Sequence, residues 1–411
     1  MASPTPLSTD TTPALSRWRL GFMGFLALLT LIPVTMPVPV LRGLIQTRFD
    51  VSELQTSLFM SINMIGAILG APLAGMLSDY FGKRKWPIVF ALFADAFCFY
   101  LLTLDVSFPL FMTFRFFEGV AHIVALSLLL ALAVESQSSE KHGRIMGMMG
   151  AGITFGVALG APLGGVMGKH NPLLPIYLGV FINLTTALLS ALFLKEIQKR
   201  KKEKVHLREI FRTLRGNKWI LIPLSFTFID RFTVGFFTAT FSLYMKRIFQ
   251  LPPPQIGFLL ALFLFPFALL SYPFGRISEK TSRSLMLLGG SFVYGLLLLT
   301  LGWWTPKGLP YLMLMLGLTS AVMFVPSLVM TTDLASAETK ATALGGFNAA
   351  GSLGFMLGPI TGGWVSQTVA ASHGWHTGYT ASFIVAGCAE LLCVMLALPL
   401  LLSLRSSKRT T

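Results

Sequence analysis

Apolar residues are grouped along this chain in long runs, separated by short polar or charged connections. The runs are too long to be half-buried strands and carry too few polar positions for the surface of a soluble helix. A helix of roughly 20 apolar residues is long enough to cross a bilayer. We therefore predict an all-α membrane protein with twelve spans, at residues 18–41, 54–77, 86–104, 107–133, 143–167, 174–195, 218–246, 254–277, 284–304, 309–333, 340–368 and 377–402.

The composition agrees with this pattern. Of the 411 residues, 54% are apolar and only 12% are charged, whereas a soluble protein carries about 25% charged residues. The net charge of +15 would suit a nucleic-acid partner, but most Lys and Arg residues lie in connections on one side of the predicted spans. This asymmetry places those connections and both termini in the cytoplasm. We expect a multi-pass membrane protein, in the inner membrane if its source is bacterial, with no nucleic-acid partner.

The longest polar connection separates six predicted spans from six. It divides the chain into a disordered tail (1–17), an N-terminal six-helix bundle (18–195), a basic linker (196–217), a C-terminal six-helix bundle (218–402) and a second tail (403–411). Cations beside a membrane set the topology and attract anionic lipid. We therefore expect the linker to be a solvated cytoplasmic segment that contacts membrane lipid.

The two halves repeat each other at a nearly constant offset. Because six spans lie in each half, the repeats share one orientation and are related by an axis along the membrane normal. A shift of 200 residues aligns Phe49 with Phe249, Gln55 with Gln255, Gly75 with Gly275, Asp79 with Glu279 and Lys83 with Arg283; a shift of 198 aligns Glu135 with Asp333, Gly147 with Gly345, Gly156 with Gly354 and Gly160 with Gly358.

A charged turn joins the second and third predicted spans. It contains Gly75, Asp79, Gly82, Lys83 and Arg84, at set spacing between two apolar runs. These residues resemble the conserved loop between helices two and three of the major facilitator superfamily of transporters. The resemblance implies two pseudo-symmetric six-helix bundles, a substrate site near the bilayer midplane between them, and no cofactor.

The resemblance also implies that this turn takes part in gating. Asp79 is expected to pair with a cation or with the positive N-terminal end of another helix, and Arg84 is expected to reach Glu135. Such contacts would hold the cytoplasmic side closed and would break on switching. The alternative is a charged turn that only sets topology. The corresponding residues in the second half are Gly275, Glu279 and Asp333.

Two spans, the fifth and the eleventh, carry glycines four residues apart, and each also carries a proline. Small residues at this spacing allow close contact between helices, and a proline bends a helix. The fifth span resembles the glycine-rich signature of antiporter-like members of the superfamily, which implies export. The residues are Gly156, Gly160, Pro162 and Gly164 in the fifth span, and Gly354, Gly358, Pro359 and Gly362 in the eleventh.

The fourth span has an ionisable face. Arg115, Glu118 and His122 lie at i, i+3 and i+7, which places them on one side of a helix. Ionisable residues inside a membrane are costly and usually line cavities or pair with each other. Arg115 resembles the superfamily arginine that is associated with proton coupling. Glu118 is then either the proton carrier itself or a static partner of Arg115.

The seventh span adds a second candidate site. Asp230 and Arg231 point about 100° apart on a helix, so they cannot face the same spot. Asp230 is expected to line the cavity opposite the fourth span, and the alternative is a buried ion pair between Arg231 and a carboxylate of another helix. Asp95 and Glu390 are weaker candidates, since they lie in spans that are expected to be on the outside of the fold.

Taken together, these features predict a secondary transporter that moves a small organic solute by alternating access, as a proton-coupled exporter and as a monomer. An importer, or a lipid or lysolipid mover of the same fold, remains open. A polytopic membrane enzyme or sensor is a further alternative, but the sequence contains no His-Glu-x-x-His zinc motif, phosphate-binding loop or Gly-x-Ser-x-Gly nucleophile turn. We therefore expect neither catalysis nor a bound metal.

Overall fold

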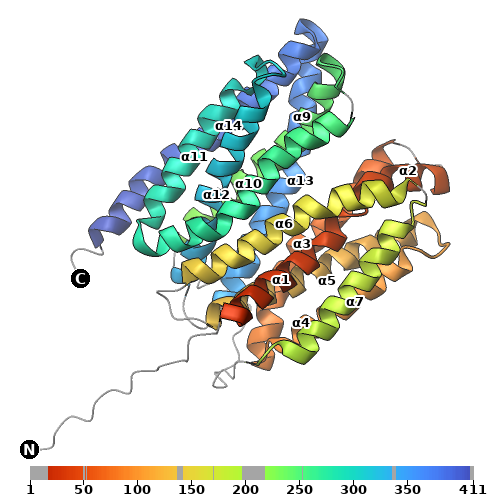
Figure 1. The fold of residues 1–411 in the computed structure, drawn as a ribbon, viewed down its shortest axis with the longest axis vertical. Coiled ribbons are helices and arrows are strands. Elements are labelled where there is room, and N and C mark those ends of the chain that lie inside the picture. Colours follow the sequence, from red (N-terminus) through yellow and green to blue (C-terminus); the bar gives the residue numbers. More distant parts are fainter. Residues whose placement is uncertain are drawn as a thin grey trace, which may run out of the picture.

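The computed structural model describes residues 17–49, 51, 53–136, 142–169, 171–196, 218–251, 253–335 and 339–407, and every regular element within them is a helix (Figure 1). Most of the expected tails and of the basic linker lie outside these residues. The helices are α1 (Arg17–Thr35), α2 (Val38–Phe49), α3 (Glu53–Phe81), α4 (Lys85–Leu101), α5 (Phe108–Glu135), α6 (His142–Gly168), α7 (Leu174–Phe193), α9 (Leu221–Ile248), α10 (Pro253–Lys280), α11 (Arg283–Thr300), α12 (Leu309–Asp333), α13 (Lys340–His373) and α14 (Trp375–Ser407), with short 3-10 turns η2 (Lys218–Ile220) and η3 (Leu301–Trp303).

Within the described residues, nine helices are long and apolar enough to cross a membrane. The first expected span, 18–41, is not one continuous helix. α1 ends at Thr35, and after a turn at Met36 and Pro37 the chain continues as α2. Proline has no backbone N–H to donate and disfavours helical geometry in the residue before it. The prolines of this stretch therefore end the first helix inside the apolar run.

The helices form two groups (Figure 1). In the first group, α1 packs on α6, α3 packs on α5, and α4 packs on both α5 and α7. In the second group, α9 packs on α13, α10 on α12, and α11 on α14. The groups meet through α3 with α13 and through α6 with α10 and α12. They come together at the end of the molecule that carries the chain termini, which we call the closed end, and diverge at the other end (Figure 1).

The glycines of α6 and α13 lie where these helices touch their neighbours. A Cβ atom added at Gly156 would lie 2.6 Å from the Leu28 carbonyl oxygen of α1, and one at Gly160 would lie 2.7 Å from that of Ile32. The same close approach recurs in the second group, where α13 contacts α9. The other glycines with such contacts are Gly164 of α6 (against Met36) and three of α13: Gly354 (against Phe228), Gly358 (against Phe232) and Gly362 (against Thr240 and Phe236).

Two prolines, Pro162 and Pro359, lie inside the same helices, which continue past them. The Pro162 side chain is exposed, and that of Pro359 is half-buried. The missing backbone N–H of each proline leaves one carbonyl unbonded a turn earlier. Each of these two long helices, which also join the groups, therefore lacks one backbone hydrogen bond at its proline.

Candidate functional site

Polar contacts join the helices at the closed end of the molecule. Arg84 forms a two-pronged ion pair with Glu135 at the end of α5, with Nε and Nη2 each 2.6 Å from a carboxylate oxygen. Both side chains are nearly buried. Gly82 has a positive φ of 61°, which suits glycine in the turn before α4, and Lys83 is exposed. Gly75 and Asp79 belong to α3, but the surroundings of Gly75 and the side chain of Asp79 lie outside what the structure describes.

The second group has an equivalent contact. Arg283, at the start of α11, pairs with Asp333 at the end of α12. Asp333 also contacts the His142 ring across the boundary between the groups, with Nδ1 and Oδ1 3.1 Å apart. One carboxylate therefore connects its own group to the first helix residue of α6.

Glu279 links the two groups directly. Its Oε1 accepts a hydrogen bond of 2.7 Å from the backbone N–H of Arg144, in the first turn of α6. The Arg144 guanidinium lies 3.6 Å from the other oxygen of the same carboxylate. A carboxylate at a helix N-terminus is stabilised by the unpaired backbone N–H groups and the helix dipole. Beside this contact, Gly275 of α10 packs against Gly143 of α6.

We predict that Glu279→Gln weakens this closed end. The glutamine oxygen can still accept the bond from Arg144 but has no charge, and a hydrogen bond to a charged group is about 1 kcal/mol stronger than a neutral one, which is about a fivefold change in population. A cysteine placed at the buried Ser278 should therefore react with a water-soluble maleimide about fivefold faster in the Glu279→Gln background. Asp105→Asn, a change of an exposed acid, is the matched control. If the Ser278 cysteine is labelled at the same rate in the otherwise unchanged protein, in Glu279→Gln and in Asp105→Asn, the Glu279 contact does not hold the closed end together.

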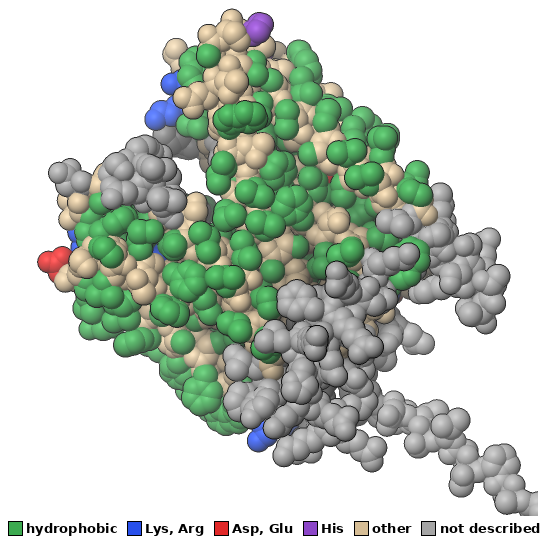
Figure 2. Space-filling model, turned by 180° about the vertical axis from the view of Figure 1, so that it is seen from behind, with side chains coloured by type: hydrophobic (Ala, Val, Ile, Leu, Met, Phe, Trp, Pro, Cys, Tyr) green, Lys and Arg blue, Asp and Glu red, His purple; other side chains and the backbone are tan. Residues whose placement is uncertain are grey.

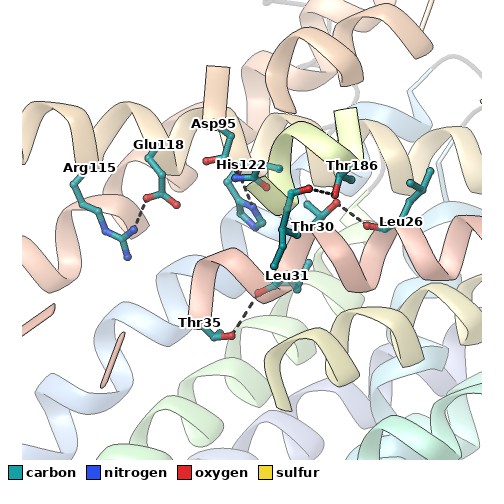
Figure 3. A network of polar contacts seen from close by, with 11 residues as sticks. Leu26, Thr30, Leu31, Thr35, Asp95, Arg115, Glu118, His122 and Thr186 are labelled. Carbon is teal, nitrogen blue, oxygen red and sulfur yellow. Dashed lines mark hydrogen bonds and ion pairs between the residues drawn. The ribbon is translucent and has the colours of Figure 1, made fainter. Parts of the chain in front are cut away.

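Inside the first group lies a buried polar network that joins three helices (Figure 3). On α5, Arg115 Nη1 lies 2.8 Å from Glu118 Oε2. One turn further along, the His122 ring lies 3.8 Å from Asp95 Oδ2 on α4. The same Asp95 oxygen accepts a 3.1 Å hydrogen bond from Asn183 on α7. All five side chains are nearly or fully buried, so we name them the N-network.

A second buried network lies inside the other group. Glu390 on α14 accepts hydrogen bonds from Ser291 on α11 (2.8 Å) and from Thr233 on α9 (3.3 Å). Asp230, one turn from Thr233, is buried, and its Oδ2 lies 3.8 Å from Arg231 Nε. We name these five residues the C-network.

Asp230 and Arg231 face different surroundings. The Arg231 guanidinium lies over the rings of Phe324 on α12 and Phe355 on α13, 4.6 and 5.3 Å from their centroids. Both carboxylate oxygens of Asp230 are buried without a hydrogen-bond partner among the described residues. Asp230 shares its helix face with Thr233, whose hydroxyl contacts Glu390. The structure thus places Asp230 toward the interior of its own group, whereas the sequence led us to expect it on the wall of a central cavity.

The networks have the same charge balance. The N-network contains two carboxylates, one arginine and one histidine, and the C-network contains two carboxylates and one arginine. With the acids ionised and the histidine neutral, each network has one unbalanced negative charge. An unbalanced buried charge is costly, so each network has a physical reason to take up a proton.

The space between the two groups is open at one end. Figure 2 shows a deep notch between the two lobes of the surface, opposite the closed end. Closer to the closed end, Asn348 of α13 donates a 2.9 Å hydrogen bond to the Ser127 hydroxyl of α5. Phe155 of α6 and Phe265 of α10 lie edge to face, with centroids 6.2 Å apart. These contacts join the two groups.

The sequence did not point to every residue of these networks. Asp95 and Glu390 were weaker candidates because their helices were expected to lie on the outside. Both are fully buried, because each faces a neighbouring helix of its own group. Asn183 and Ser291, which donate to them, stand in apolar runs. The only available signal for all four was a polar residue at mid-span.

Comparison with known proteins gives a consistent result. A family model described as Major Facilitator Superfamily matches residues 23–241 and 224–411. An uncharacterized MFS-type transporter of Methanocaldococcus jannaschii is 24% identical over 380 residues, which are 87% of this chain and 93% of that protein. Multidrug resistance protein 1 of Bacillus subtilis is 24% identical over 58% of this chain and 60% of its own length.

Other matches are shorter or more distant. The class H tetracycline resistance protein of Pasteurella multocida is 25% identical over 43% of this chain and 44% of its own length. The crystal structure of the human organic anion transporter MFSD10 (TETRAN) has a TM-score of 0.78 with this structure and 20% sequence identity. That comparison covers 92% of this chain and 99% of the human chain, so the two share a fold.

Proposed function

This chain belongs to the Major Facilitator Superfamily, and from that premise we propose that it is a proton-coupled exporter of a small organic solute. As a member of this superfamily it is a multi-pass membrane protein and a secondary transporter. The proposal adds the driving ion, the direction and the twelve-span arrangement. In that arrangement α1 and α2 together form the first span, and each group of helices is one six-helix bundle.

The observation that carries proton coupling is the charge balance of the two networks. Glu118 Oε1 and Asp95 Oδ1 are buried without a hydrogen-bond partner among the described residues. A proton bound to the N-network removes its unbalanced charge, and release of the proton restores it. The network is more stable with the proton than without it. If water reaches the network in one of the two access states and not in the other, proton binding favours one state and proton release favours the other.

Alternating access is supported by the contacts at the closed end. Among the contacts between the groups, three lie at helix ends on this side: Arg144 with Glu279, His142 with Asp333, and the Gly143–Gly275 approach. Breaking them would separate the groups at this end without unpacking either one. If the termini lie in the cytoplasm, as the distribution of cations suggests, the open notch faces outward.

Export rests on two lines of support. The relatives include proteins named for multidrug and tetracycline resistance, and α6 carries the glycine pattern that resembles antiporters. A substrate path with few charges suits an amphiphilic or weakly ionic organic molecule better than a phosphorylated one. An importer of the same fold would use the same networks, but its solute would move in the same direction as the protons.

Reconstitution in liposomes tests this proposal. With protein of defined orientation and an imposed pH gradient, we expect a fluorescent amphiphilic dye to move against the proton flux, and an interior pH indicator to report proton movement that depends on the dye. Dye movement in the same direction as the protons would indicate import. Dye movement with no coupled change of pH would contradict proton coupling.

A further inference from the structure

An apolar groove lies on the outer face of the first group of helices, between α4 and α5. Its volume is about 630 Å³. Lys83 lies at one end, and Cys98 and Phe117 lie toward the other. From Trp86 to Cys98 the helix rises about 18 Å, while the hydrocarbon core of a bilayer is about 30 Å thick. The groove therefore extends from the membrane surface to about the middle of the bilayer, which is the depth of one leaflet.

The groove is formed by an arrangement of small and large side chains. Ala91 and Ala94 of α4, with Ala121 of α5, lie along it and leave space. Phe90 and Phe97, which also line it, are more than half exposed and form one rim. A hollow with this lining is suited to a flexible hydrocarbon chain, because alanines take little volume and the phenylalanine rings supply apolar contact area.

The mouth of the groove is basic. Lys83 is exposed, and the Lys85 ammonium lies 5.5 Å from the centroid of the Trp86 ring, at the level where tryptophan marks a membrane interface. The nearby Glu196 carboxylate accepts hydrogen bonds from the backbone N–H groups of Arg84 (2.7 Å) and Lys85 (3.1 Å). That carboxylate caps the start of α4 and is held by the backbone, which leaves the lysines to face the headgroup region.

We propose that this groove binds one anionic phospholipid of the leaflet at the closed end of the molecule, with an acyl chain along the alanines and the phosphate at Lys83. The lipid is a bound partner and does not enter the path between the two groups. The proposal does not depend on the direction or coupling of transport.

Native mass spectrometry of the detergent-solubilised protein tests the headgroup contact. The protein is titrated with dioleoyl phosphatidylglycerol and, separately, with dioleoyl phosphatidylcholine, which has the same chains and no net charge. One cation near an anionic lipid is worth about a fivefold change in affinity. We expect Lys83→Gln to weaken binding of the first phosphatidylglycerol about fivefold and to leave phosphatidylcholine unchanged. Lys169→Gln, at an exposed lysine beyond the end of α6, is the matched control.

Ala94→Trp tests the chain contact in the same assay. Ala94 is exposed to the membrane and lines the groove, so a larger side chain fills the hollow without entering the core. We expect it to remove the tightest phosphatidylglycerol site, while Val293→Trp on the exposed face of α11 retains that site. The proposal is overturned if Lys83→Gln and Ala94→Trp bind phosphatidylglycerol as the parent does, or if each control loses as much as its test variant.

Discussion

Glu118→Gln is expected to abolish transport driven by a pH gradient while the protein keeps its fold. The substitution removes one negative charge from the N-network, which then has Arg115 balanced by Asp95 and no unbalanced charge left for a proton to neutralise. A glutamine oxygen still accepts a hydrogen bond from Arg115. Transport should therefore fail because the network no longer exchanges a proton, and the measurement is dye movement together with interior pH in liposomes.

A double-mutant cycle separates this role from simple ion pairing. Arg115→Gln leaves two buried acids without their cation, and loss of one partner from a buried pair typically costs about 3–5 kcal/mol. The double variant Arg115→Gln/Glu118→Gln has the charge balance of the parent, so its thermal unfolding temperature should rise again. Its transport should stay absent, because the residue expected to bind the proton has been removed.

The cycle also shows which results would contradict the assignment. If the double variant recovers both stability and proton-driven transport, Glu118 is only the static partner of Arg115, and the proton binds elsewhere in the network. If Glu118→Gln alone transports as the parent does, the N-network does not couple transport at all. Asp105→Asn, an exposed carboxylate, should behave as the parent in every assay.

How far the sequence predicts this site depends on the distance between the residues involved. Arg115 and Glu118 are three residues apart, and helical periodicity alone brings them to one face. The placement of Arg84 opposite Glu135 followed from a resemblance between motifs, not from periodicity. In contrast, the pairing of Asp95 with Asn183 depends on which outer helices touch. In a membrane protein both the lipid-facing and the buried sides of a helix are apolar, so the pattern does not show which side a polar residue faces.

The break between α1 and α2 illustrates a related limit. The apolar run from residue 18 to residue 41 is continuous, so hydropathy treats it as one span. The break is a local backbone effect of proline, and which of three nearby prolines ends the helix depends on packing. The turn falls at Met36, whose carbonyl lies against Gly164 of α6. The helix therefore ends where its chain contacts a residue that lies more than a hundred positions further along the sequence.

The second large effect is expected from Gly275→Leu, which should prevent the closed end from closing. A Cβ atom at Gly275 would lie 2.7 Å from the Gly147 Cα across the boundary between the groups, and it would also meet the Gly143 carbonyl. Because the obstruction is backbone on both sides, no side chain can rotate away to relieve it. The two groups must then separate at this end, while the packing inside each group is unchanged.

We therefore expect Gly275→Leu to eliminate transport and to make a cysteine at Ser278 reactive toward a water-soluble maleimide, with little change in thermal unfolding. Gly363→Leu is the matched control, since a Cβ atom there meets nothing within 4 Å. Normal transport by Gly275→Leu would mean that this glycine contact is not part of the cycle. A large loss of stability without new reactivity at Ser278 would mean that the contact belongs to the folded core, and that the two groups do not separate along it.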